Sequence, residues 1–183
     1  MSNIKIGITQ GDINGISYEV ILKTLEDNRI CELCTPIVYG SPKVAAYHRK
    51  MLNLNVNLNI INKAEDALEK RPNIINCCNE EIKVEVGTST PQAGEAAFKA
   101  LERATRDLKE GKIDVLVTAP INKNNIQSES FSFPGHTEYL ESLFGEKGDA
   151  LMVLANDSIR IAVVTGHVPV SKISACLTKE NIL

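Results

Sequence analysis

The chain has 183 residues, 43% of them hydrophobic, and a formal net charge of −3, which suits one globular core and excludes the concentrated basic surface of a sequence-independent nucleic-acid binder. With 4% aromatic residues, the chain also offers little surface for base stacking. No apolar run approaches the roughly 18 residues that span a bilayer and no secretory pattern opens the chain, so the sequence predicts a cytoplasmic protein without membrane or nucleic-acid partners.

Strand and helix patterns alternate along the first half of the chain. An apolar run at residues 4–9 predicts a strand. The face of the first helix is predicted from apolar residues at helical spacing, namely Ile16, Val20, Ile21 and Leu25. Shorter patterns predict a helix at residues 43–52 and strands at residues 36–39, 55–62, 74–78 and 82–86.

The second half of the chain holds the strongest patterns. A helix at residues 92–110 is predicted from one apolar stripe, which consists of Ala93, Ala96, Ala97, Ala100, Leu101, Ala104 and Leu108. Gly111 stands where a C-cap is expected. Residues 113–119 are apolar on both faces, which is typical of a central parallel strand. The remaining predicted elements are a helix at residues 136–144, buried strands at 151–155 and 159–165 joined by a turn at 156–158, and a helix that begins within 170–183.

This order of elements predicts an α/β fold with a mixed, mostly parallel sheet and helices on both faces. The chain contains no internal repeat and no low-complexity segment. Because the last helical pattern stops without a terminal cap, we expect residues 1–183 to be the N-terminal portion of a larger protein.

Four polar segments lie where a ligand is expected. In open α/β sheets, ligands collect beyond the carboxyl ends of the strands. The segments are TQGD at residues 9–12, TAPINK at 118–123, PGHTE at 134–138 and TGHVP at 165–169. The first carries neither the GxGxxG of a Rossmann site nor the GxxxxGK[ST] of a P-loop. Because Gly11, Asp12 and Lys123 follow the carboxyl ends of predicted strands, they are candidates for lining the ligand cleft.

Two histidines are candidate site residues. His136 and Thr137 at a helix start offer an imidazole, a hydroxyl and backbone N–H groups to an anion; alternatively, Thr137 only caps the helix and His136 is a loop residue. His167 follows an apolar strand and suits a divalent metal, although a structural role is the alternative. A metal needs three or four ligands, so further ligands must come from elsewhere.

Two other basic side chains have simpler expected roles. Lys123 follows a strand and could pair with a phosphate or carboxylate as a point charge. The alternative for Lys123 is a solvated surface lysine. His48 lies in a predicted surface helix, and we expect its imidazole to be solvated.

The chain has an odd number of cysteines, and no secretory signal accompanies them. The five are Cys31, Cys34, Cys77, Cys78 and Cys176. These features favour free thiols over a disulfide framework. Cys31 and Cys34 have the spacing of half a zinc site, but Cys77 and Cys78 do not supply the second half.

The four polar segments together resemble motifs of the bacterial 4-hydroxythreonine-4-phosphate dehydrogenase family of vitamin B6 synthesis. The family's TAPINK and PGHTE appear unchanged at residues 118–123 and 134–138, and its T-x-H-x-P-L loop appears as TGHVPV at 165–170. Its opening turn, of the type TPGDPAGIGPE, appears as TQGDINGISYE at residues 9–19. Four such motifs in order, over nearly the whole chain, make the match specific.

The resemblance implies an isocitrate/isopropylmalate-dehydrogenase-like, two-domain oxidoreductase that forms a homodimer. It implies NAD- or NADP-dependent oxidation of 4-hydroxy-L-threonine 4-phosphate with decarboxylation to 3-amino-2-oxopropyl phosphate, in pyridoxine and pyridoxal phosphate biosynthesis. It further implies substrate contacts at His136 and Thr137, and a role for His167 as one of three histidine ligands to a divalent cation (zinc, magnesium or cobalt). The other ligands lie further along the chain in the family, so we expect residues 1–183 alone to be inactive.

The opening turn departs from the family pattern. At five positions this sequence differs from the family motif. In order, the family's Pro, Pro, Ala, Gly and Pro are replaced by Gln10, Ile13, Asn14, Ser17 and Tyr18. Losing prolines is expected to loosen the backbone of the turn. Two alternative functions stay open: a related phospho-threonate or phospho-erythronate dehydrogenase, and a non-catalytic module that binds a phosphorylated ligand.

Overall fold

The computed structural model describes residues 3–78, 81–145, 150–166 and 168–182. The chain divides into two compact units, Met1–His136 and Thr137–Leu183. Within the described residues, no helix is both long and apolar enough to cross a membrane.

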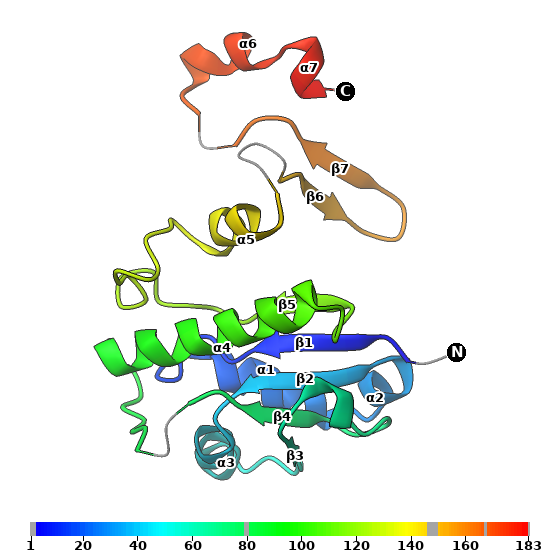
Figure 1. The fold of residues 1–183 in the computed structure, drawn as a ribbon, viewed down its shortest axis with the longest axis vertical. Helices are drawn as coiled ribbons and strands as arrows, with labels where there is room; N and C mark the ends of the chain where they lie inside the picture. Colours follow the sequence, from blue (N-terminus) through cyan, green and yellow to red (C-terminus); the bar gives the residue numbers. More distant parts are fainter. Residues whose placement is uncertain (1–2, 79–80, 146–149, 167, 183) are drawn as a thin grey trace. The chain divides into compact units, whose positions relative to one another are not determined.

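The first unit is built on a sheet of five strands in the order β3-β4-β2-β1-β5 (Figure 1). The strands are β1 (Lys5–Thr9), β2 (Thr35–Gly40), β3 (Asn59–Ile61), β4 (Asn73–Asn76) and β5 (Val115–Thr118). Every neighbouring pair is parallel. The helical elements are α1 (Ser17–Glu26), α2 (Arg29–Leu33), α3 (Pro42–Met51), the 3-10 turn η1 (Ala64–Asp66) and α4 (Pro91–Lys109).

Side chains of β2 show how the sheet is covered on both faces. Val38 packs in one core cluster with side chains of α1 and α3. Ile37 and Tyr39, which point the other way along the strand, pack with Ala100 and Ala104 of α4. The parallel sheet with helices on both faces confirms the predicted fold class (Figure 1).

Helix α4 forms as its sequence predicts. The Thr90 hydroxyl accepts a hydrogen bond from the Ala93 N–H, and Pro91 occupies the first helical position, where its missing N–H costs nothing. The predicted stripe is buried from Ala93 to Ala104. Gly111 follows the helix with φ of 68°, a conformation that glycine adopts without strain.

The buried face of α1 agrees with the prediction at Ile21 and Leu25, which are buried, and differs from it at Ile16 and Val20. Ile16 and Val20 are 61% and 48% exposed, whereas Tyr18 and Leu22 are fully buried. Tyr18 defines the inward face because its hydroxyl is hydrogen bonded inside the first unit, to the Gln10 side chain.

The prediction for His48 was wrong. Its side chain is 1% exposed on α3 and stacks on the ring of Tyr18, with 5.4 Å between ring centroids. The His48 Nε2 lies 2.8 Å from the Ile13 carbonyl oxygen. His48 therefore has a structural role in joining α3 to the opening turn.

Two predicted strands in the first unit need correction. Residues 82–86 form no strand. The Glu85 N–H donates to the Asn14 side chain, and the N–H of Gly87, just after the segment, donates to the Asn14 carbonyl oxygen. Strand β5 exists but is not central, since β1 is its one neighbour among the described strands. As a result, Val115 and Val117 are 44% and 46% exposed.

The second unit contains α5 (His136–Phe144), which starts at the last residue of the first unit, and the antiparallel strands β6 (Met152–Ala155) and β7 (Arg160–Val163). The predicted turn between these strands is confirmed, because the Asn156 side chain accepts from the N–H groups of Ser158 and Ile159. The expected burial of both strands was wrong for the described unit, since a two-stranded hairpin covers neither of its own faces. The unit ends in η2 (Val170–Lys172), α6 (Ile173–Cys176) and α7 (Lys179–Ile182).

Candidate functional site

Two of the four predicted segments meet at one edge of the sheet. Strands β1 and β5 are parallel neighbours, and Thr9 pairs with Thr118 at their carboxyl ends. Beyond this pair, the Asp12 N–H donates to the Pro120 carbonyl oxygen, with N and O 2.8 Å apart. The TQGD turn and the TAPINK loop are therefore joined directly, as the carboxyl-end rule predicts.

Gly11 makes this junction possible. Its φ is 61°, in the left-handed region that residues with a Cβ rarely adopt. A Cβ on Gly11 would lie 2.3 Å from the Pro120 carbonyl oxygen and 2.7 Å from the Ser17 Oγ. Glycine is thus required here both by the backbone conformation and by the close approach of the TAPINK loop.

We expect a Gly11→Ala variant to lose about 2–5 kcal/mol of unfolding free energy, by adding about 1–2 kcal/mol of left-handed strain to about 1–3 kcal/mol of overpacking. Urea unfolding measures this loss. The matched control is Gly87→Ala, because Gly87 has φ of 77° but no atom within 4 Å of an added Cβ. Equal losses in the two variants would contradict the packing part of the explanation.

Two of the three residues that replace the family's prolines, Gln10 and Tyr18, are hydrogen bonded to each other. The expected loosening of the turn stays a prediction. The Gln10 Oε1 accepts from the Tyr18 hydroxyl (2.8 Å) and from the Ser41 N–H (3.0 Å). The Gln10 Nε2 donates to the Ala96 carbonyl oxygen (2.8 Å). Burial raises the pKa of Tyr18 well above its usual value, so the phenol keeps its proton and donates. These hydrogen bonds connect the turn to the rest of the first unit.

Asn14 adds a second connection that the sequence did not reveal. Its Nδ2 donates to the Thr88 carbonyl oxygen (2.8 Å) and to the Thr90 Oγ1 (3.1 Å). Thr90 is also the N-cap of α4. The Asp12 carboxylate accepts from the Asn14 N–H (3.0 Å), so it stabilises the turn locally.

His136 is a titratable residue with a buried ring nitrogen, Nε2, that has no hydrogen-bond partner among the described residues. Burial lowers the pKa of His136 below the usual range, and the Lys123 ammonium lowers it further. The ring is therefore neutral at pH 7 and has an unsatisfied nitrogen, which a bound ligand could pair with.

Thr137 is exposed and is the second residue of α5. The capping position precedes the first helical residue, so the helix boundary places Gly135 there, and not Thr137. In the second unit Thr137 contributes to the wall of a pocket of about 390 Å³, together with Leu140, Glu141, Phe144, Gly145, Ala150, Leu151 and Met152. Its hydroxyl is thus accessible to a ligand.

The predicted metal ligand His167 lies outside the described residues. Its neighbours Thr165 and Gly166 follow β7 in the second unit. Within the described ranges, no group of three or more His, Cys, Asp or Glu side chains is arranged to hold a metal ion. The described side chains therefore do not make a metal site on their own.

The cysteines are free thiols, and they do not suggest nucleophilic catalysis. Burial, with a smaller effect of Cys78, raises the pKa of Cys77 to about 12. Burial also raises the pKa values of Cys31, Cys34 and Cys78. Because the thiolate is the reactive form, these four thiols are unreactive at neutral pH.

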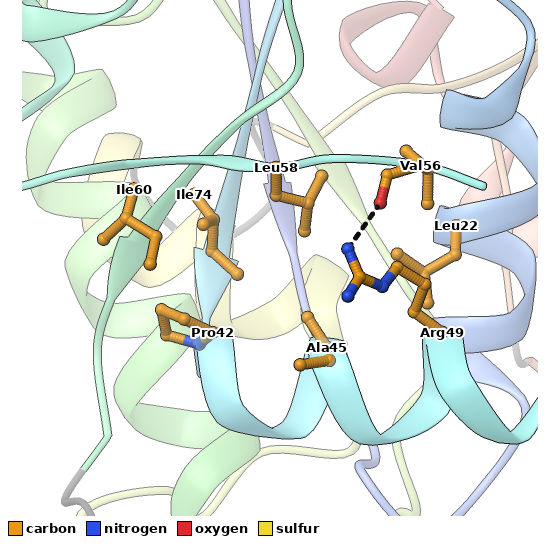
Figure 2. A pocket seen from close by; sticks show the side chains of 9 residues that line it. Leu22, Pro42, Ala45, Arg49, Val56, Leu58, Ile60 and Ile74 are labelled. Carbon is orange, nitrogen blue, oxygen red and sulfur yellow. Dashed lines mark hydrogen bonds between the residues drawn. The ribbon is translucent and has the colours of Figure 1, made fainter. Parts of the chain in front are cut away.

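A cavity of about 160 Å³ lies beside α3, away from the predicted site residues (Figure 2). Its wall is apolar apart from Arg49, whose Nη1 donates to the Val56 carbonyl oxygen at 3.3 Å. The other lining residues are Leu22, Pro42, Ala45, Ala46, Leu58, Ile60 and Ile74. Because its lining residues include no acid, base or nucleophile, this cavity is not a candidate active site.

The sequence is similar to those of known proteins. A profile of the family described as pyridoxal phosphate biosynthetic protein PdxA matches residues 32–183. A 4-hydroxythreonine-4-phosphate dehydrogenase of Bacteroides thetaiotaomicron is 56% identical over 181 residues, which cover 99% of this chain and 50% of that protein. A Clostridium botulinum protein with the provisional name D-threonate 4-phosphate dehydrogenase is 33% identical, over 97% of this chain and 54% of its own length.

The fold is similar as well. The crystal structure of a 4-hydroxythreonine-4-phosphate dehydrogenase from Klebsiella pneumoniae matches with a TM-score of 0.83 at 28% identity, covering 100% of this chain and 55% of that one. The chain thus spans about half the length of the curated relatives it matches.

Proposed function

Because the chain belongs to the pyridoxal phosphate biosynthetic protein PdxA family, as its four motifs predicted, we propose that the protein oxidises 4-hydroxy-L-threonine 4-phosphate with NAD or NADP. Decarboxylation of the oxidised substrate then gives 3-amino-2-oxopropyl phosphate, for pyridoxal phosphate biosynthesis. The observation that carries this proposal is the 56% identity to the Bacteroides protein named for this substrate.

A second candidate substrate is D-threonate 4-phosphate. The 33% identity to the Clostridium protein supports it. The higher identity to the Bacteroides protein favours 4-hydroxythreonine 4-phosphate as the substrate.

Within this function, we assign substrate contacts to His136 and Thr137. The neutral His136 ring has a buried Nε2 without a partner among the described residues, and a substrate oxygen or hydroxyl would satisfy it. Thr137 offers an exposed hydroxyl. The Lys123 ammonium supplies positive charge for an anionic group, and Gly11 and Asp12 shape the end of β1 on the cofactor side.

When bound, NAD or NADP would accept a hydride, and zinc, magnesium or cobalt would lower the pKa of the substrate hydroxyl. We propose His167 as one metal ligand. The described side chains form no complete metal site, so the other ligands have to come from residues outside them.

We further propose that residues 1–183 are the N-terminal portion of a two-domain enzyme that acts as a cytoplasmic homodimer. The half-length coverage of the relatives supports the proposal that residues 1–183 are part of a longer protein. The partner molecule in this proposal is a small phosphorylated amino acid, and no nucleic acid or membrane is involved.

A turnover assay tests the proposed function, and it uses the purified full-length enzyme because residues 1–183 alone are expected to be inactive. Reduction of NAD or NADP is followed with each of the two phosphorylated substrates and with unphosphorylated 4-hydroxythreonine, in the presence of a divalent metal. We expect the highest kcat/KM for 4-hydroxythreonine 4-phosphate. A higher kcat/KM for D-threonate 4-phosphate would move the assignment to the second candidate, and no reduction with either would contradict the proposal.

A further inference from the structure

The loop of residues 120–125, which carries Lys123, is held at its first residue by the opening turn. The Pro120 carbonyl oxygen accepts from the Ser17 hydroxyl at 2.6 Å and from the Asp12 N–H at 2.8 Å. Ser17 is fully buried. A carbonyl oxygen has two lone pairs, so these two donors satisfy it completely and fix its direction.

The same loop is held at its last residue by α4. A Cβ on Gly94 would lie 1.8 Å from the Asn125 carbonyl oxygen and 2.4 Å from its carbonyl carbon. Glycine inside a helix is destabilising relative to alanine, so a benefit elsewhere must offset it. Here the benefit is direct contact between the backbones of α4 and the loop.

Between these two ends, Asn122 fixes the turn itself. Its Oδ1 accepts from the N–H groups of Asn124 (3.0 Å) and Asn125 (3.4 Å), and its Nδ2 donates to the Ser89 Oγ (3.2 Å). Lys123 is thus an exposed side chain on a backbone that is fixed on both sides.

We propose that Ser17 and Gly94 are positioning residues, which hold the loop of residues 120–125 so that the Lys123 ammonium lies beside the His136 ring. Burial lowers the pKa of His136, and an immobilised cation there lowers it further. The cation also places a positive charge next to a buried nitrogen that has no partner among the described residues. The role of this pair in substrate binding rests on the proposed function. The position of Lys123 is testable without substrate.

The test is the pKa of the His136 imidazole, measured by NMR titration of isotope-labelled protein in metal-free buffer and assigned with a His136→Gln variant. Lys123→Gln is expected to shift this pKa upward, toward the value of about 6.5 of a solvated histidine. Ser17→Ala and Gly94→Ala are expected to shift it in the same direction, because they release the loop.

Two control variants separate positioning from general destabilisation. Ser41→Ala removes a buried hydroxyl that accepts from the Val44 N–H at the start of α3, and Lys50→Gln removes a surface charge on the same helix. Both are expected to leave the pKa of His136 unchanged.

An unchanged pKa of His136 in Lys123→Gln would overturn the proposal. The proposal would also be overturned if Lys123→Gln raises this pKa but Ser17→Ala and Gly94→Ala both leave it at the wild-type value. If Gly94→Ala does not fold, the result for Ser17→Ala decides. Absence of turnover with the phosphorylated substrates would contradict the proposed function but would not change the measured pKa values of His136. Failure of the proposed function and failure of the positioning proposal are therefore distinguishable.

Discussion

Replacing His136 with alanine, or Thr137 with valine, is expected to lower kcat/KM for 4-hydroxythreonine 4-phosphate. A hydrogen bond to a charged group contributes about 1.5–3 kcal/mol, which corresponds to roughly ten- to hundredfold in affinity. His136 meets the structural requirement for such a bond, since its Nε2 is buried without a partner among the described residues. Steady-state kinetics of the two variants give the loss.

The competing explanation is that both residues only stabilise the start of α5. Even a substitution that removed a complete helix cap would cost only about 0.5–2 kcal/mol of stability, and it would leave the chemistry unaffected. Ser142→Ala is the matched control, because its hydroxyl donates to the Tyr139 carbonyl oxygen within the same helix at 2.7 Å. If His136→Ala and Thr137→Val melt at a lower temperature, as is expected for Ser142→Ala, but turn over substrate normally, these two residues are not substrate contacts.

Replacing His167 with alanine is expected to abolish metal-dependent turnover while the fold stays intact. In the proposed site His167 is one of a small set of metal ligands. Substituting a residue that only hydrogen bonds to a metal ligand costs roughly 10–100-fold in metal affinity, so losing a ligand itself should cost more. Calorimetric titration with zinc, together with turnover at several metal concentrations, measures the effect.

His136→Ala is the comparison for this variant, because it removes an imidazole that is not assigned to the metal. We expect it to bind zinc as the wild type does. Wild-type metal affinity and undiminished turnover at limiting metal in His167→Ala would contradict the assignment of His167.

Local patterns in the sequence predicted an element well where several independent signals agree. Helix α4 has a cap, a proline at its first position and a regular stripe, and all three signals agree. For β5 the apolar pattern predicted burial on both faces, but Val115 and Val117 are exposed because the strand has one neighbour among the described residues. Periodicity reports which side chains are apolar and does not report what covers them.

Part of the candidate site was also predictable. The rule that ligands collect at the carboxyl ends of parallel strands correctly joined the TQGD and TAPINK segments. The contributions of Ser17, Asn14 and Gly94 were not predictable, because a short polar side chain has many possible partners and a helical glycine reads as a weak helix former. The burial of His48 was missed for a similar reason, since its partner Tyr18 lies on another helix.

The most direct test of the account is whether the phosphorylated substrate binds at His136. The measurement is an NMR titration of the isotope-labelled protein with 4-hydroxythreonine 4-phosphate, which follows the ring nitrogens of its histidines, while calorimetry reports binding in parallel. We expect the His136 Nε2 resonance to shift and saturate at the concentrations at which calorimetry detects binding, whereas the buried His48 ring stays unchanged. Binding in the calorimeter with an unchanged His136 resonance would contradict the account.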